Sequence, residues 1–175
     1  METKTKKIVI IGPESTGKTA TCKHLAKKYN TIFVKEYARK YLSNLDKKYN
    51  YNDLTIIARE QIKQEKKAIS AKHKIIFYDT NILTIKIWSN FKYKKCDPFI
   101  IEQTNKQKYD LYILCNNDIT WQYDILRENK NERKKIFDIY LHELKNKNFK
   151  ILKKTGKKRL KNAEDICNLF LKTNT

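Results

Sequence analysis

The chain has 175 residues, of which 40% are apolar and 33% charged, a composition typical of one folded domain and not of a disordered chain. No run approaches about 18 consecutive apolar residues, which excludes a membrane-spanning helix. The four cysteines form no CxxC pair, which argues against a zinc site or a disulfide framework. The first residues, METKTKK, contain no apolar signal region. We therefore expect a cytoplasmic protein whose residues 1–175 form a single domain.

The formal net charge of +20 raises the question of a nucleic-acid partner. Only five of the 39 basic residues are arginine, and asparagine occurs 16 times. Because lysine and asparagine both have A-rich codons, a biased nucleotide composition accounts for this charge without any partner. Arginine is also the better reader of phosphates and bases, since its planar fork donates two parallel hydrogen bonds. We expect a lysine-coated surface and no nucleic-acid partner, and no particular oligomeric state is predicted.

Apolar runs and helical periodicity alternate along the chain. Strands are predicted at KKIVIIG, TIFVKEY, KIIFYDT, YDLYILC and NFKILKK. Helices are predicted over residues 17–29, 37–46, 53–70, 81–90, 97–107, 131–146 and 162–171. Almost wholly apolar strands separated by helices indicate a parallel sheet that is covered on both faces. The predicted fold class is α/β, in three layers, with a five-stranded and mostly parallel sheet between helices.

A glycine-rich stretch, GPESTGKT at residues 12–19, fits the pattern G-x-x-x-x-G-K-[ST] between a predicted strand and a predicted helix. Wrapping a phosphate requires converging backbone N–H groups, which need unusual φ angles and close approach without Cβ atoms. The helix N-terminus adds its positive end. The motif predicts that Lys18 reaches the β- and γ-phosphates of ATP or GTP and that Thr19 takes a Mg²⁺ position. The predicted nucleotide-binding residues here are Gly12, Glu14, Ser15, Thr16, Gly17, Lys18 and Thr19.

An acid, Asp79, ends the predicted strand KIIFYDT and is followed by Thr80 and Asn81. A carboxylate beside a phosphate loop can hold the water shell of Mg²⁺ or orient an acceptor hydroxyl, so Asp79 is predicted as a metal and catalytic residue. The alternative role of Asp79 is to cap the next helix. ATPases that perform mechanical work often carry a glutamate after this aspartate. Thr80 stands there instead, which favours transfer to a bound acceptor.

The second predicted strand runs into Glu36, Tyr37 and Arg39. In small-molecule kinases of this architecture the end of the second strand faces the phosphoryl acceptor. A carboxylate there can accept the proton of the acceptor hydroxyl, so Glu36 is predicted to be catalytic and substrate-binding. Arg39 is predicted either to clamp the acceptor or to pair with a nearby carboxylate. A structural ion pair between such groups is the alternative for both.

A polar segment at about residues 117–134 follows the fourth predicted strand and contains Arg127 and Arg133. We predict that it forms a lid over the phosphates, where guanidinium groups neutralise the transferring phosphoryl group and exclude water. The alternative is a solvated helix start with incidental arginines. Gly156 and Arg159 follow the fifth strand, where an adenine ring usually rests in such folds.

Six segments together resemble a known kinase family. GPESTGKT, KEYARKY, NDLTIIAREQ, IIFYDTN, YDLYILCNND and TWQYDILR follow the order of the NadR-type ribosylnicotinamide kinase domain, a P-loop kinase family, over nearly the whole chain. The resemblance implies phosphorylation of nicotinamide riboside at its 5′-hydroxyl to nicotinamide mononucleotide, with ATP as co-substrate and Mg²⁺. It places Lys18 and Thr19 in the nucleotide site, Glu36 and Arg39 on the acceptor side, Asp79 at the metal, and Arg127 in the lid.

The resemblance also directs attention to aromatic residues and to departures from the family pattern. A cationic nicotinamide ring would favour an aromatic face, for which Tyr37, Trp88 and Trp121 are candidates. Where the family usually has D-T-D, this chain has Asn81 in the third place, and Asn81 is also a predicted substrate contact. Where the family has D-D-G-x-R, this chain has YDILR, which ends at Arg127. From the length we expect no adenylyltransferase domain of the kind that full NadR proteins carry. A kinase for another nucleoside or nucleotide, a nucleic-acid-linked P-loop ATPase and, because of Asn81, a non-catalytic nucleotide sensor stay open as alternatives.

Overall fold

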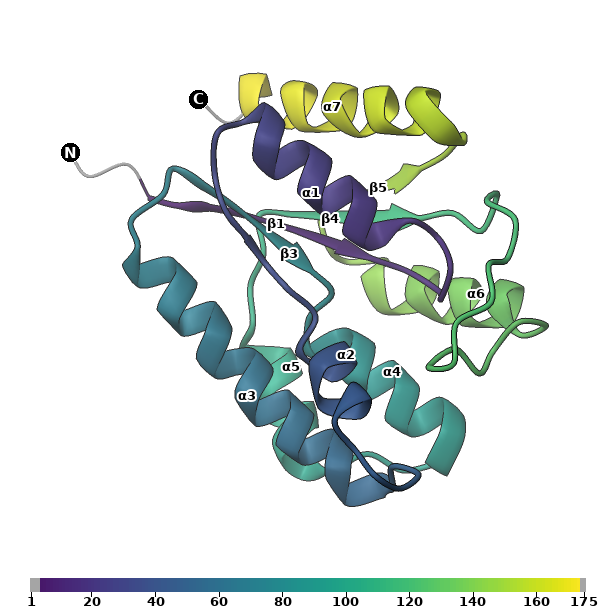
Figure 1. Ribbon diagram of the computed structural model, residues 1–175. Coiled ribbons are helices and arrows are strands. Elements are labelled where there is room, and N and C mark those ends of the chain that lie inside the picture. Colours follow the sequence, from purple (N-terminus) through teal and green to yellow (C-terminus); the bar gives the residue numbers. More distant parts are fainter. Residues whose placement is uncertain (1–3, 174–175) are drawn as a thin grey trace.

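The computed structural model describes residues 4–173, which form one sheet flanked by helices (Figure 1). The elements follow in the order β1 (Lys6–Ile11), α1 (Lys18–Lys28), β2 (Phe33–Val34), α2 (Tyr37–Ser43), α3 (Tyr51–Ser70), β3 (Ile75–Asp79), α4 (Ile82–Tyr93), α5 (Pro98–Lys106), β4 (Leu111–Cys115), α6 (Arg133–Leu144), β5 (Phe149–Leu152) and α7 (Gly156–Thr173). Within residues 4–173, no helix is long and apolar enough to cross a membrane.

The sheet has five strands in the order β2-β3-β1-β4-β5, and each of these pairings is parallel. The predicted three-layer α/β fold is therefore confirmed, with a sheet that is parallel throughout its described pairings. β1 is central, between β3 and β4. The connection that leaves β1 runs through α1 on one face of the sheet, whereas those that leave β3 and β4 run through α4 and α6 on the other, so the side of the connections reverses beside β1. The carboxyl ends of parallel strands beside such a reversal are where α/β sheets bind ligands.

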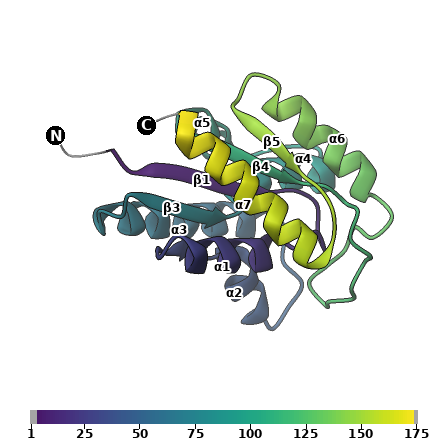
Figure 2. The same ribbon diagram turned by 90° about the horizontal axis from the view of Figure 1, so that it is seen from above.

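The residues of β1 alternate between two buried layers because successive strand side chains point to opposite faces. Ile8 and Ile10 pack with the residues of α1 and α7, among them Leu25. Val9 and Ile11 pack on the opposite face, with residues of α4 and α6. Figures 1 and 2 show α1 and α7 together over one face and α3, α4 and α6 over the other. A third apolar cluster joins α2, α3, α4 and α5 beneath the site described below.

Several element boundaries differ from those predicted, notably those of β2, α6 and α7. β2 pairs with β3 only through Phe33 and Val34, because the chain turns away at Glu36 to start α2. α6 spans Arg133–Leu144, two residues shorter at each end than residues 131–146. α7 begins at Gly156 instead of residue 162, and its first turn is fixed by the buried Arg159, whose N–H bonds to the carbonyl of Thr155. Gly156 therefore starts a helix, whereas the prediction had placed it in a loop.

A buried carboxyl group lies under the sheet edge, on α3. The carboxylate of Glu65 accepts hydrogen bonds from Tyr109 Oη at 2.9 Å and from Gln107 Nε2 at 2.7 Å. Gln61 Nε2 lies 3.4 Å from its other oxygen, and Gln61 Oε1 accepts the backbone N–H of Tyr37 at 2.9 Å. Burial raises the pKa of Glu65 from 4.5 to about 7, although these donors and Lys7 lower it. The network connects the start of α2 to the interior.

The raised pKa of Glu65 predicts that the free energy of unfolding depends on pH. Because the folded state holds this proton up to about pH 7 and the unfolded state releases it at its ordinary carboxyl pKa, stability falls as pH rises between the two values. The expected loss is about 3 kcal/mol at most. Urea denaturation of the parent and of Glu65→Gln at several pH values between 5 and 8 measures it. The parent is expected to lose stability relative to the variant as pH rises; equal pH slopes would contradict this.

Candidate active site

The loop between β1 and α1 bends tightly around its own backbone. Gly12 has a φ of 140°, and a Cβ atom there would lie 2.8 Å from the carbonyl oxygen of Cys115 on β4. Gly17, at a φ of 75°, caps the N-terminus of α1, and Ser15 also adopts a positive φ of 55°. Only glycine tolerates the approach at residue 12, so the two glycines give the loop its shape. The N-terminus of α1 points its N–H groups into that loop.

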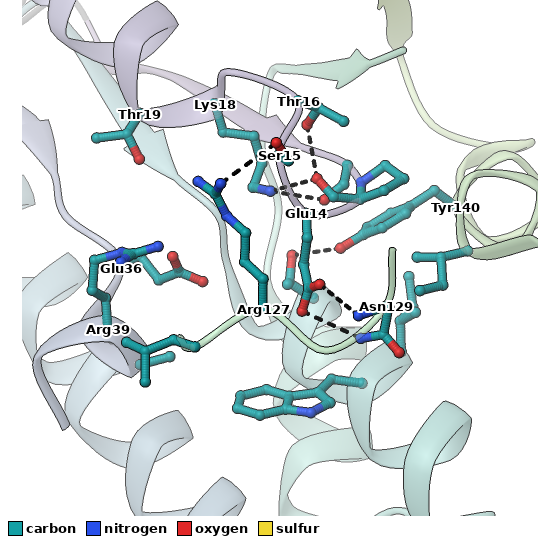
Figure 3. A pocket seen from close by; sticks show the side chains of 18 of the residues that line it. Glu14, Ser15, Thr16, Lys18, Thr19, Glu36, Arg39, Arg127, Asn129 and Tyr140 are labelled. Atoms are coloured by element: carbon teal, nitrogen blue, oxygen red, sulfur yellow. Dashed lines mark hydrogen bonds between the residues drawn. The ribbon is translucent and has the colours of Figure 1, made fainter. Parts of the chain in front are cut away.

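The side chains of Lys18 and Thr16 bend back onto the backbone of the loop (Figure 3). Lys18 Nζ donates to the carbonyls of Gly12 at 3.0 Å and Pro13 at 2.8 Å, and Thr16 Oγ1 donates to the same Pro13 carbonyl at 2.8 Å. These bonds hold the ammonium group across the mouth of the loop. A cation there, beside helix N–H groups, is suited to the phosphates of a nucleotide.

Asp79, at the carboxyl end of β3, accepts a hydrogen bond from Thr19 Oγ1 at 2.5 Å through its Oδ2 atom. Its side chain is buried, and Oδ1 has no hydrogen-bond partner among the described residues. Burial raises the pKa of Asp79, whereas Thr19 and Lys18 lower it. A hydroxyl and an orphaned carboxylate oxygen at a phosphate loop are oxygen ligands of the kind Mg²⁺ takes, with water and phosphate completing its shell. These two residues therefore fit the metal predicted from the sequence.

The backbone between Asp79 and Asn81 is held in an unusual conformation. Thr80 has a φ of 67°, which is costly for a β-branched residue, and its N–H donates to the carbonyl of Ile10 on β1. Asn81 is buried and begins α4 without a side-chain cap, and its Oδ1 lacks a described partner. The hydrogen bond from Thr80 to β1 holds the turn that follows Asp79 at the end of the sheet.

A cavity of about 190 Å³ opens beside the phosphate loop (Figure 3). Its polar lining comes from the loop, from Glu36 and Arg39 at the start of α2, and from Arg127 and Asn129 in the segment between β4 and α6 (residues 116–132, the β4–α6 segment). Its apolar lining consists of Ala38, Leu42, Ile87, Trp88, Phe91, Leu126 and Ile136, with Tyr140 and Thr84 beside them. The cavity therefore has a phosphate-binding end and an apolar end.

The carboxyl group of Glu36 lies in this cavity together with the Lys18 ammonium group. Burial raises the pKa of Glu36, the positive charges of Lys18 and Arg39 lower it, and the negative charges of Asp79 and Glu14 raise it. A carboxyl group with a raised pKa in a cavity is suited to take up a proton from a bound hydroxyl group.

Arg39 binds the β4–α6 segment. Its Nη1 atom donates to Asp124 Oδ2 at 2.8 Å, and the ion pair spans 85 residues of sequence. The backbone N–H of Leu126 and the guanidinium group of Arg39 lower the pKa of Asp124, against the effect of its partial burial. Of the two roles predicted for Arg39, the structure contains the carboxylate pairing, while its guanidinium group also lines the cavity.

The β4–α6 segment packs directly on the phosphate loop. The N–H of Gln122 donates to Ser15 Oγ at 2.9 Å. Arg127 Nη1 donates to the Gln122 carbonyl at 2.6 Å and lies 3.5 Å from the same Ser15 oxygen. Arg127 thus reaches the phosphate end of the cavity from the segment predicted as a lid.

Glu14 ties the same segment down from the loop side. Its Oε2 atom accepts the backbone N–H groups of Glu128 at 3.1 Å and Asn129 at 2.9 Å, and Asn129 Nδ2 donates to Oε1 at 3.2 Å. The sequence predicted Glu14 only as a nucleotide-binding member of the loop motif. Its carboxylate is the partner of two amides that lie more than a hundred residues further along the chain.

Glu14→Ala is expected to release this segment. Hydrogen bonds to a charged acceptor contribute about 1.5–3 kcal/mol each, so amide exchange at residues 128 and 129 should accelerate about 10- to 100-fold. Hydrogen exchange measured by mass spectrometry, with Glu102→Ala on α5 as a matched control, checks this. Exchange rates equal to those of the parent would mean that Glu14 does not hold the segment.

Arg133 and Arg159 donate hydrogen bonds to backbone carbonyls of the phosphate loop. Arg133 Nη2 donates to the carbonyls of Ile119 at 2.8 Å and Ser15 at 3.3 Å. Arg159 Nη2 donates to the Thr16 carbonyl at 2.8 Å, and its Nη1 pairs with Asp118 at 2.7 Å. Both arginines are buried, so their contacts with the protein position the loop backbone.

The structure brings most predicted site residues together but leaves some outside the cavity. Trp88 lies in the apolar wall of the cavity, and its contact with a substrate stays a prediction. Tyr37 packs against Tyr41 and the α2–α5 cluster. Trp121 lies beside the guanidinium group of Arg133. The residues predicted as site members that do not line the cavity are Tyr37, Asp79, Asn81, Arg133 and Gly156.

Sequence reasoning missed part of the apolar wall. Thr84, Phe91 and Tyr140 line the cavity, and Tyr140 Oη donates to Thr84 Oγ1 at 3.1 Å. Thr84, Trp88 and Phe91 recur at helical spacing on α4, so a helical projection around Trp88 could have found Thr84 and Phe91. No sequence signal connected Tyr140, on α6, to that face.

Comparison with known proteins agrees with this geometry. A family model described as an AAA domain matches residues 7–159. Two curated relatives are trifunctional NAD biosynthesis/regulator proteins NadR. The chain is 27% identical to that of Salmonella typhimurium strain LT2 over 151 residues, and 26% identical to that of Escherichia coli strain K12 over 152 residues. The matches cover 83% of this chain and only 37% of either relative.

Solved structures show the same fold. A crystal structure of a NadR protein in complex with NR superposes with a TM-score of 0.81 at 20% identity, covering 95% of this chain and 51% of that one. A deoxyadenosine kinase from M. mycoides gives a TM-score of 0.67 at 16% identity, covering 93% and 99%. A thymidylate kinase from Ehrlichia chaffeensis gives 0.64 at 15% identity, covering 94% and 98%. The predicted resemblance is confirmed by the curated relatives, and the solved structures confirm the fold.

Proposed function

The chain belongs to the AAA domain family, and we propose that it is an Mg·ATP-dependent kinase that phosphorylates nicotinamide riboside at the 5′-hydroxyl. The observation that carries the proposal is that Lys18 and Glu36 line one cavity. A cation suited to the γ-phosphate and a carboxylate suited to an acceptor hydroxyl then face the same space. The similarity to NadR proteins and to a NadR structure containing NR supports the choice of acceptor.

Five residues in or beside the cavity have a defined part in the proposed reaction. The phosphate loop and the N-terminus of α1 bind the phosphates, and Lys18 neutralises charge on the transferring group. Glu36 accepts the proton of the attacking hydroxyl. Arg127 approaches the phosphate end from the β4–α6 segment, which excludes water that would otherwise compete as an acceptor. Thr19 and Asp79 would hold Mg²⁺, which supplies charge neutralisation on the phosphate oxygens.

A kinase for another nucleoside or nucleotide is the second candidate. The structural likeness to a deoxyadenosine kinase and a thymidylate kinase, over almost their whole lengths, favours it. The same cavity and the same roles of Lys18 and Glu36 would serve either acceptor. A nucleic-acid-linked ATPase is less well supported, because Thr80 follows Asp79 and only five arginines are present.

Steady-state ADP release from Mg·ATP, with and without nicotinamide riboside, distinguishes these functions. We expect ADP release to depend on the riboside and to exceed the release with deoxyadenosine, thymidine or thymidylate. Greater ADP release with one of those compounds would identify that compound, and not the riboside, as the acceptor. Release stimulated only by DNA or RNA would overturn the kinase proposal.

A further inference from the structure

A tyrosine in the loop between α2 and α3 joins the β4–α6 segment to the wall of the cavity. Tyr49 Oη donates to Glu128 Oε2 at 2.6 Å and accepts from Trp88 Nε1 at 3.0 Å. Lys92 Nζ donates to the same hydroxyl at 2.5 Å and to both Glu128 oxygens at 3.0 Å. Three elements distant in sequence therefore meet at one hydroxyl group.

The Tyr49 ring reinforces these contacts. It packs edge-on against the Trp88 indole, with ring centroids 4.9 Å apart and an interplanar angle of 65°. The Lys92 ammonium group lies over the Tyr49 ring at 3.9 Å from its centroid. Burial raises the pKa of Tyr49, and the hydrogen bond to Glu128 raises it further, so the hydroxyl keeps its proton and donates. The indole is therefore held by both a stacking contact and a hydrogen bond.

Glu128 also belongs to the anchored part of the β4–α6 segment. Its backbone N–H donates to the Glu14 carboxylate at 3.1 Å, while its side chain reaches Tyr49 and Lys92. Glu128 thus bonds the phosphate loop through its backbone and, through its side chain, bonds Tyr49 beside the apolar wall of the cavity, which would face the acceptor (the acceptor wall). The Lys92–Glu128 ion pair alone contributes little free energy to holding the segment, since 34% and 44% of the two side chains are exposed.

We propose that Tyr49 is a positioning residue that sets the orientation of Trp88 in the acceptor wall according to the position of Glu128. That this wall contacts the acceptor rests on the proposed function. The inference adds Tyr49, which does not line the cavity, to the residues that determine acceptor binding. Movement of Glu128 away from the phosphate loop breaks the hydrogen bond between its carboxylate and the Tyr49 hydroxyl. The Tyr49 oxygen is then no longer held in place to accept from the Trp88 indole N–H. Nucleotide-side closure and the shape of the acceptor site are thereby coupled.

The test uses Trp88 as its own reporter. The chain has two tryptophans, so Trp121→Phe leaves Trp88 as the single indole. In that background, Tyr49→Phe keeps the ring and removes only the hydroxyl, and Glu128→Ala removes the partner side chain while keeping the backbone N–H. Tyr51→Phe is the matched control, because its ring packs on Tyr93 and it does not line the cavity. Circular dichroism verifies that each variant folds.

We expect Tyr49→Phe and Glu128→Ala to shift the Trp88 emission maximum and increase its quenching by acrylamide, with Tyr51→Phe unchanged. The double variant should change no more than either single variant, because both break one chain of contacts. In turnover, Tyr49→Phe should raise the KM for the riboside about fivefold to tenfold and leave the KM for ATP unchanged.

Two results would overturn this role for Tyr49: Trp88 emission that does not respond to Tyr49→Phe, or additive effects of the two substitutions. The fluorescence readout does not depend on turnover. Absence of riboside phosphorylation by the parent would refute the proposed function and leave the coupling of Glu128, Tyr49 and Trp88 separately measurable.

Discussion

Lys18→Ala is expected to lower kcat for the proposed phosphoryl transfer about 10²–10³-fold, the loss typical of one key electrostatic donor. The Lys18 ammonium group lies across the mouth of the phosphate loop, on the Gly12 and Pro13 carbonyls, where the γ-phosphate would approach. Alanine leaves the loop glycines and the N-terminus of α1 in place, so nucleotide binding should weaken less than turnover. ADP release under saturating Mg·ATP and acceptor measures kcat.

Lys27→Ala is the matched control for that substitution. Lys27 is exposed on the same helix and does not line the cavity. Its kcat should equal that of the parent. Unchanged turnover in Lys18→Ala would contradict the assignment of the phosphate loop, whatever acceptor is used.

Glu36→Gln is expected to lower kcat/KM about 10²–10⁴-fold, because the amide cannot take the proton of the acceptor hydroxyl. The parent should also show an acidic limb in its pH profile. A base acts only when ionised, so the rate falls as pH drops through the pKa of Glu36, which burial raises above its usual range. The variant should lack this limb. Initial rates of ADP release across the pH range of folded protein measure both effects.

Glu60→Gln, on α3, serves as the control for charge removal, since this residue lies outside the cavity and pairs with its neighbour Lys63. Its pH profile should match that of the parent. Retention of the acidic limb by Glu36→Gln would assign the limb to another group and leave Glu36 with a positioning role at most.

The fold was predictable because local patterns determine it. Near-continuous apolar strands such as β1 alternate their side chains between two helical layers, and the helices between them impose parallel pairing. The phosphate loop was predictable for a similar reason, since its glycines answer a steric requirement that is visible within eight residues. The start of α7 was not, because it depends on the contacts that bury Arg159 between the phosphate loop and Asp118.

Contacts between distant segments set the limits of sequence reasoning at the site. Nothing near Glu14 indicates that it accepts amides of residues 128 and 129, and nothing near Arg39 identifies Asp124 as its partner. The hydroxyl of Tyr49 likewise has partners 39 and 79 residues away. Each pairing depends on where the β4–α6 segment packs, which no local pattern specifies.

The mass and amount of the product formed from nicotinamide riboside and Mg·ATP decide whether this chain is a nicotinamide riboside kinase. We expect nicotinamide mononucleotide in amounts equal to the ADP released, with the phosphoryl group on the 5′-oxygen. ADP without a phosphorylated riboside, or no ADP at all, would contradict it.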